Sequence, residues 1–178
     1  MLRMNGILKN PAIAVLALAT LATAAFAFSN SLMPAAESWS LSGSIANALA
    51  PVLQGFYDLL QGLAGLTGHS MPLSYGEFVR KLARLAEYFL LGTECALVAA
   101  LLSGGRALRH IWACLFVPLA VAVMVEFLQQ FAGRTSLVSD VVVDFVRALT
   151  GIVVAVVIGW RINRDRRMAD SEGALHTG

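Results

Sequence analysis

The chain has 178 residues, of which 58% are hydrophobic and only 13% are charged, and its mean hydropathy is +0.73. This composition is too apolar for an ordinary soluble domain, so the predicted class is an integral membrane protein with a single domain over residues 1–178. The formal net charge of +2 comes without basic blocks interleaved with aromatic residues, so no nucleic-acid partner is predicted.

Four apolar runs approach the ~20 residues that are needed to cross the hydrocarbon core of a bilayer. They cover about residues 11–28, 82–102, 111–131 and 141–160. The first run has an alternative interpretation as a signal peptide, because Arg3 and Lys9 precede it and "AFA" resembles a cleavage site. Its apolar part is longer than a usual signal core, which favours a retained helix.

Basic residues predict the orientation of these spans. Arg3 and Lys9 precede the first run, "SGGRALRH" joins the second and third, and "RINRDRRM" follows the fourth. Because loops rich in Arg and Lys stay in the cytoplasm, both termini are predicted to lie inside. Residues 161–178 then form a cytoplasmic tail whose polar end is expected to be disordered. Arg80 and Lys81, at the outer mouth of the second span, are the one cost of this topology.

The segment between the first two spans, residues 29–77, contains no Lys or Arg and is predicted to face outward. We predict an amphipathic helix over about residues 44–66 that lies along the outer membrane surface or caps the bundle. Its apolar stripe consists of Ile45, Leu49, Val52, Phe56, Leu60 and Leu63. A short fifth helix that dips into the membrane is the alternative. The predicted fold is therefore an all-α integral membrane protein with four transmembrane helices.

Charged and polar residues of three predicted spans converge on the outer half of the membrane. Asp140, Asp144 and Arg147 share one helix face because they are four and three residues apart. An ionised group at the membrane centre costs at least ~2.5–3.5 kcal/mol, so we expect these side chains to point inward and pair. The candidate ligand-binding residues are Arg84, Glu87, Glu126, Gln129, Arg134, Asp140, Asp144 and Arg147.

The expected ion pairs join Glu87 or Glu126 to Arg147, and Arg84 or Arg134 to Asp140 or Asp144. Such pairing would leave a polar pocket that is open to the outside and closed toward the cytoplasm by apolar helix halves. The alternative is a network that only locks helices together, but interhelical polar contacts average only ~0.6 kcal/mol, which makes a large network inefficient for that purpose. Tyr88 is interpreted as an aromatic residue at the membrane interface.

Several carboxylates that face one cavity can also perform acid–base chemistry, so an enzyme stays an open alternative. In that case Glu87, Glu126, Asp140 or Asp144 would be the general acid or base. The chain shows no Ser-His-Asp arrangement, no phosphate-binding loop and no His/Cys metal spacing, so no cofactor and no metal are predicted. Cys95 and Cys114 lie inside apolar runs and are interpreted as buried free thiols.

Three stretches resemble the VanZ-like family of small bacterial membrane proteins, over about Ala27 to Gly159. They are "FSNSLMPAAESWSLSGS", "RKLARLAEYFLLG" and "EFLQQFAGRTSLVSDVVVDFVRALTG". The residues that match the family pattern are Arg80, Lys81, Glu87, Tyr88, Gly92, Glu126, Gln129, Gly133, Arg134, Asp140, Asp144 and Gly151. The chain departs from the pattern at Arg84, where the family usually has His, and at Arg147, where it usually has Gly.

The resemblance implies a multi-pass protein of the bacterial cytoplasmic membrane that acts at its outer face, among membrane lipids. A member of the family is implicated in low-level resistance to teicoplanin, a lipidated glycopeptide. A lipoglycopeptide or a cell-wall precursor is therefore the expected ligand, and a membrane enzyme acting on lipid-linked envelope precursors is the alternative. Because a guanidinium stays protonated, Arg84 cannot carry protons as a His can, which favours binding over proton chemistry. The two arginines gained beside the carboxylates, Arg84 and Arg147, would also suit a site for an anionic head group or a peptide carboxylate.

Overall fold

The computed structural model describes residues 11–32, 35–66, 74–103, 111–131 and 138–176, and its elements there are all α-helices. They are α1 (Pro11–Leu32), α2 (Ala35–Leu66), α3 (Tyr75–Leu102), α4 (Ile111–Phe131) and α5 (Val138–His176). Four segments are long and apolar enough to cross a membrane: α1, α3, α4 and the part of α5 from Val138 to Ile162. The prediction of an all-α multi-pass membrane protein is thus confirmed.

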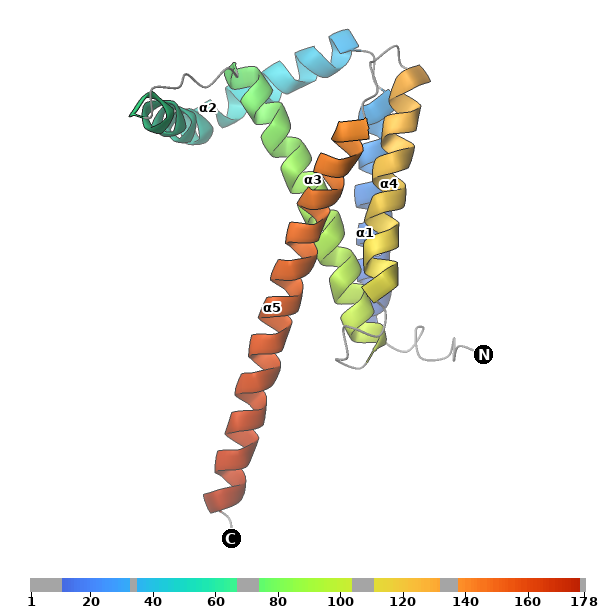
Figure 1. Cartoon of the computed structure of the whole chain (residues 1–178), viewed down its shortest axis with the longest axis vertical. Helices are drawn as coiled ribbons and strands as arrows, with labels where there is room; N and C mark the ends of the chain where they lie inside the picture. Colours follow the sequence, from blue (N-terminus) through green and yellow to red (C-terminus); the bar gives the residue numbers. More distant parts are fainter. Residues whose placement is uncertain (1–10, 33–34, 67–73, 104–110, 132–137, 177–178) are drawn as a thin grey trace.

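The four candidate spans form a bundle in which α5 crosses α3, while α2 runs out sideways from one end (Figure 1). Two contacts between α3 and α5, one at each end of their crossing, show that the helices run parallel. Arg84 lies near Asp144 at one end of the crossing, and farther along both helices Thr93 donates a 3.3 Å hydrogen bond to the carbonyl oxygen of Gly151. Two spans separated by one intervening span must run in the same direction through a bilayer, as these two helices do.

Two glycines let the backbones of α3 and α5 touch. A Cβ atom added at Gly92 would overlap the carbonyl oxygen of Ala148, and one added at Gly151 would overlap that of Phe89. Each helix therefore offers a surface without a side chain to the backbone of the other. In a membrane, where lipid tails are as apolar as the side chains, such close approach is a main source of helix association.

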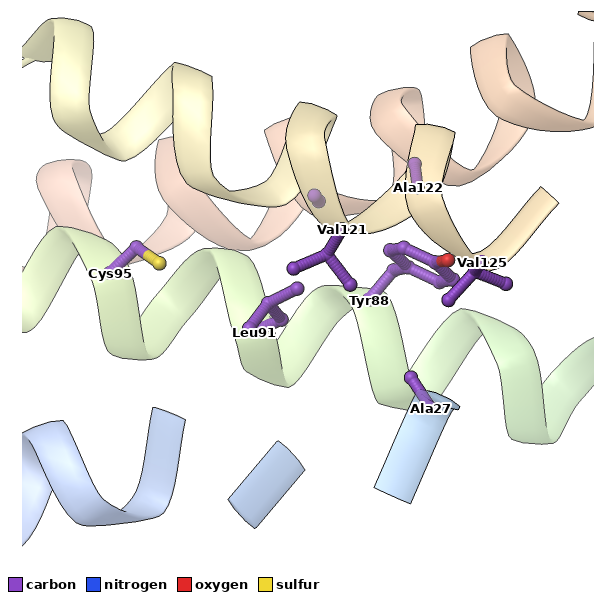
Figure 2. Close-up of a cluster of buried hydrophobic side chains, with 8 residues drawn as sticks. Ala27, Tyr88, Leu91, Cys95, Val121, Ala122 and Val125 are labelled. Atoms are coloured by element: carbon purple, nitrogen blue, oxygen red, sulfur yellow. The ribbon is translucent and has the colours of Figure 1, made fainter. Parts of the chain in front are cut away.

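The core of the bundle lies around this crossing. Figure 2 shows Tyr88 and Leu91 of α3 facing Val121, Ala122 and Val125 of α4. Ala27 from α1 and Ala148 from α5 complete the cluster. Outward side chains of the spans are exposed large hydrophobics, such as Leu18, Phe116 and Val153, as a lipid-facing surface requires.

An aromatic cluster attaches α2 to the start of α3. The ring of Tyr57 lies 5.5 Å from Tyr75 and 5.4 Å from Phe78, measured between centroids. A capping box then begins α3, because the Ser74 side chain accepts from the Glu77 backbone and the Glu77 side chain accepts from the Ser74 backbone. This box explains why the helix starts at Tyr75, before the apolar run that begins near residue 82.

The expectation that the polar end of the tail is disordered is wrong as far as residue 176, because α5 continues to His176. The segment contains four Arg and two Ala, which are good helix formers, and it has no Pro, so the helix can continue beyond the membrane span. Arg164 lies over the ring of Trp160, one turn earlier, at 5.3 Å from its centroid, and this cation–π contact also favours the helical spacing.

We predict that Gly151→Val destabilises the protein far more than Gly159→Val, although both changes place the same residue in α5. At Gly159 a new Cβ would meet nothing within 4 Å, whereas at Gly151 it would meet the α3 backbone, and overpacking of this kind costs about 1–3 kcal/mol or more. Thermal unfolding in detergent measures the difference. A thiol-reactive dye reports it, because Cys95 and Cys114 are buried free thiols that become accessible when the protein unfolds. Equal unfolding midpoints for the two variants would contradict the role of the crossing.

Candidate functional site

The side chain of Asp144 in α5 is held between two guanidinium groups. It is 2% exposed, one of its oxygens accepts a hydrogen bond from Arg147, and the other lies 3.6 Å from Nη1 of Arg84 in α3. Arg147 is one turn farther along α5, and Arg84 reaches across from the neighbouring helix. We call these residues the Arg84–Asp144–Arg147 triad. The predicted pair of Arg84 with Asp144 is confirmed.

The triad explains how an ionised aspartate can be buried in an apolar bundle. A buried charge is tolerated when it is paired and its lone pairs are satisfied, and here each carboxylate oxygen has its own cation. The guanidinium groups are less buried than the acid, since the side chain of Arg84 is 30% exposed and that of Arg147 is 18% exposed. Because both oxygens of Asp144 are engaged, the geometry favours an anchor for the two arginines over a general base.

Two hydrogen bonds join α1 to acids of α3. Asn30 Nδ2 donates to Glu87 Oε1 at 2.7 Å, and Thr23 Oγ1 donates to Glu94 Oε1 at 3.1 Å. The residue numbers rise on one helix as they fall on the other, so α1 and α3 are antiparallel. The two bonds are seven residues apart on each helix, which places them ~10 Å apart along the axis.

This arrangement corrects one predicted pair. Glu87 turns toward Asn30 of α1, and within the described part of the chain no ion pair joins it to Arg147. The roles of Asn30 and Thr23 were missed by the sequence analysis. Their spacing of seven residues matches that of Glu87 and Glu94, and this match was the available signal.

The interpretation of Tyr88 as an interfacial aromatic is wrong. Its side chain is 1% exposed and lies inside the core cluster, beside Val125 of α4 (Figure 2). Tyr88 follows Arg84 by one helical turn and shares its face of α3, so the ring extends from the apolar core toward the triad. Its hydroxyl lies near enough to Asp144 for electrostatic interaction, yet it makes no geometrically sound hydrogen bond with any described residue.

The C-terminal end of α4 adds two buried polar residues on the same side of the core. Glu126 is 4% exposed and Gln129 is 3% exposed, and Gln129 lies one turn beyond Val125 on the same helix face. The Nε2 atom of Gln129 has no hydrogen-bond partner among the described residues. Three helices thus bring polar side chains to one end of the bundle, as the sequence predicted.

Two candidate residues are not part of this assembly as the structure describes it. Asp140 lies half-buried in the first turn of α5, and no ion pair in the described ranges includes it. Arg134 falls in the segment 132–137, which lies outside the described residues.

A comparison with family models now places the chain. The model described as VanZ/LLP1 matches residues 15–159. The chain belongs to the VanZ/LLP1 family. This confirms the resemblance noted above. The family consists of membrane proteins that are linked, at family level, to glycopeptide resistance. No curated protein and no solved structure matches the chain. The matched range includes the whole triad and the α3–α5 crossing.

We predict that Asp144→Asn lowers the stability of this VanZ/LLP1 protein by about 3 kcal/mol, because it leaves two guanidinium groups without their shared counter-ion. Asp140→Asn is the matched control, since it makes the same change one turn earlier on α5 at a half-exposed position. Thermal unfolding of both variants in detergent measures the effect. A control variant that loses as much stability as Asp144→Asn would show that the triad is not a special anchor.

Proposed function

We propose that this VanZ/LLP1 protein binds an amphiphilic envelope molecule at the outer face of the bacterial cytoplasmic membrane. Binding there lowers the susceptibility of the cell to lipoglycopeptides such as teicoplanin. The observation that carries the proposal is the Arg84–Asp144–Arg147 triad. Intramembrane ionisable residues usually mark a functional site, and this group keeps two partly exposed cations at one end of the bundle.

A role limited to holding helices together accounts less well for the same residues. A purely structural network gains stability when its buried polar atoms are satisfied, because an unsatisfied buried donor costs about 1–3 kcal/mol. The hydroxyl of Tyr88 and the amide nitrogen of Gln129 are buried, and neither has a hydrogen-bond partner among the described residues. These atoms sit at the end of the bundle where the triad lies, and a bound ligand would satisfy them.

The outward orientation of the triad is supported by the opposite end of the bundle. Trp160, Arg161 and Arg164 are exposed near the end of the α5 span, and Trp112 is exposed at the start of α4. Aromatic belts mark membrane interfaces, and Arg-rich flanks mark the cytoplasmic one. If this end is cytoplasmic, as we propose, the triad lies near the outer surface.

The faces of α2 support its proposed position along the outer membrane surface. Leu53, Tyr57 and Leu60 pack against the start of α3, and Gln54 and Asp58 are exposed on the far side. An apolar stripe at steps of three and four residues remains between these faces, and its members are 43% to 83% exposed: Leu49, Val52, Phe56, Leu59, Leu63 and Leu66. A helix that rests on lipid beside a transmembrane helix needs one face that packs on that helix, one apolar face for lipid and one polar face for water, and α2 has all three.

The function predicts a change in antibiotic susceptibility. A teicoplanin-sensitive bacterial host that expresses the native chain should become less susceptible, and the protection should be lost with Arg84→Gln and with Arg147→Gln. Arg161→Gln is the matched control, because it removes an exposed arginine at the opposite end of the α5 span. Minimal inhibitory concentrations at matched membrane levels measure the effect. A native chain that inserts correctly and gives no protection would refute the proposal.

The position of α2 predicts a contrast between two labelled residues. An environment-sensitive fluorophore on Val52→Cys should emit in the blue-shifted range and be quenched by spin-labelled lipid, because the side chain would contact acyl chains. The same fluorophore on Asp58→Cys should report water. Native Cys95 and Cys114 are buried and leave little background. Equal emission and equal quenching at both positions would show that α2 does not rest on the bilayer.

A further inference from the structure

Hydrogen-bond donors at the triad end of the bundle are less fully used by the protein than the acceptors of the triad. Each guanidinium has five N–H donors, and Asp144 accepts from one nitrogen of Arg147 and lies near one nitrogen of Arg84. The Gln129 amide nitrogen is a buried donor that has no partner among the described residues, and the Tyr88 hydroxyl is a second buried donor, which lies close to the Asp144 carboxylate without a well-formed hydrogen bond. The two arginines and Gln129 thus keep N–H donors that the described hydrogen bonds do not use.

The acidic groups nearby are largely committed within the protein. Both oxygens of Asp144 face arginines, and one oxygen of Glu87 is held by Asn30 on the α1 side. Glu126 is almost fully buried and has an interaction of its own, although its Oε2 atom accepts no hydrogen bond from the described residues, while Asp140 sits half-buried in the first turn of α5 without an ion pair in the described ranges. At the triad itself, a cationic ligand would have to displace an arginine from Asp144, whereas an anionic ligand would meet donors that are already in place.

The geometry also brings two cations to opposite oxygens of one acid. Arg84 comes from α3 and Arg147 from α5, and the parallel crossing of these helices brings both to Asp144. Asp144 thereby limits the repulsion between the guanidinium groups, whose partly exposed edges stay available. Two planar forks of donors are well suited to the oxygens of a phosphate or carboxylate group.

We infer that the Arg84–Asp144–Arg147 triad, with Tyr88 and Gln129 as additional donors, binds the anionic group of an amphiphile, a phosphate or a carboxylate, from the outer leaflet. This inference rests on the proposed function of the same site and adds the chemical class of the ligand. The apolar core around Tyr88 closes the site below the anion, so the acyl part of the ligand stays in the surrounding lipid.

The test uses the full chain purified in neutral detergent and a fluorescent short-chain phosphatidic acid. Fluorescence anisotropy gives its dissociation constant, and the same fluorophore on a diacylglycerol is the neutral control. We expect saturable binding of the phosphatidic acid only. Arg84→Gln and Arg147→Gln should each weaken it at least about tenfold, because a charge-assisted hydrogen bond is lost. Arg161→Gln, at the other end of the span, should leave it unchanged.

A second variant keeps the test decisive if an arginine variant fails to fold. Tyr88→Phe preserves the ring in the core and removes only the buried hydroxyl, so the unliganded variant should unfold at the temperature of the native chain or above it. It should weaken binding of the phosphatidic acid about fivefold. Equal affinity for the phosphatidic acid and the diacylglycerol, or unchanged affinity in the folded Arg84→Gln, Arg147→Gln and Tyr88→Phe variants, would overturn the inference.

Competition identifies the source of the anion. If inorganic phosphate and acetate displace the lipid at millimolar concentration, the site takes free anions as well as lipid head groups. If neither competes, the anion must be attached to a lipid, and both results support an anion site. Protection from teicoplanin that survives in variants without lipid binding would refute the proposed function alone. Protection that depends on the arginines, without preference for the phosphate lipid, would refute the anion site alone.

Discussion

The close approach of α3 and α5 through Gly92 and Gly151 is the constraint on which the rest of the structure depends. In a bilayer, burial of apolar side chains gives little preference for protein over lipid, so helices associate where their backbones can pack closely. The missing side chains let each helix rest on a backbone carbonyl of the other. Because the two helices run parallel, charges near the start of α3 meet charges near the start of α5. An antiparallel crossing would have carried them to opposite sides of the membrane.

The triad and the crossing support each other. Asp144 lies one turn before Ala148, the residue that Gly92 contacts, so the carboxylate is fixed beside the tightest part of the interface. That position removes it from solvent, and the two guanidinium groups make its burial possible. Tyr88 couples this polar end to the core, because its ring packs with Leu91 and Val125 while its hydroxyl extends toward Asp144. A ligand bound at the triad would therefore rest on the best-packed part of the bundle.

Sequence patterns predicted the features that depend on helix length, helix face and membrane depth. The four spans followed from apolar length, and the pair of Arg84 with Asp144 followed from the cost of charge at similar depth on two inward faces. What failed depended on how each helix is rotated against its neighbours. Periodicity shows that Arg84 and Tyr88 share a face, but it does not show that this face meets α4 and α5. The partner of Glu87 was missed for the same reason. The few polar residues of α1 did not indicate which face of that helix meets α3, so Asn30 could not be assigned to Glu87.

The two residues at which the chain departs from the expected family pattern, Arg84 and Arg147, converge on one carboxylate. The resemblance to the family pattern implies a His in place of Arg84 and a Gly in place of Arg147, and in this chain both arginines contact Asp144. A single aspartate beside a histidine could exchange a proton with it near neutral pH. In this chain both partners are guanidinium groups that stay protonated, so the charge of the cations is fixed. The Arg84–Asp144–Arg147 triad therefore holds its charges in place and is not suited to proton transfer.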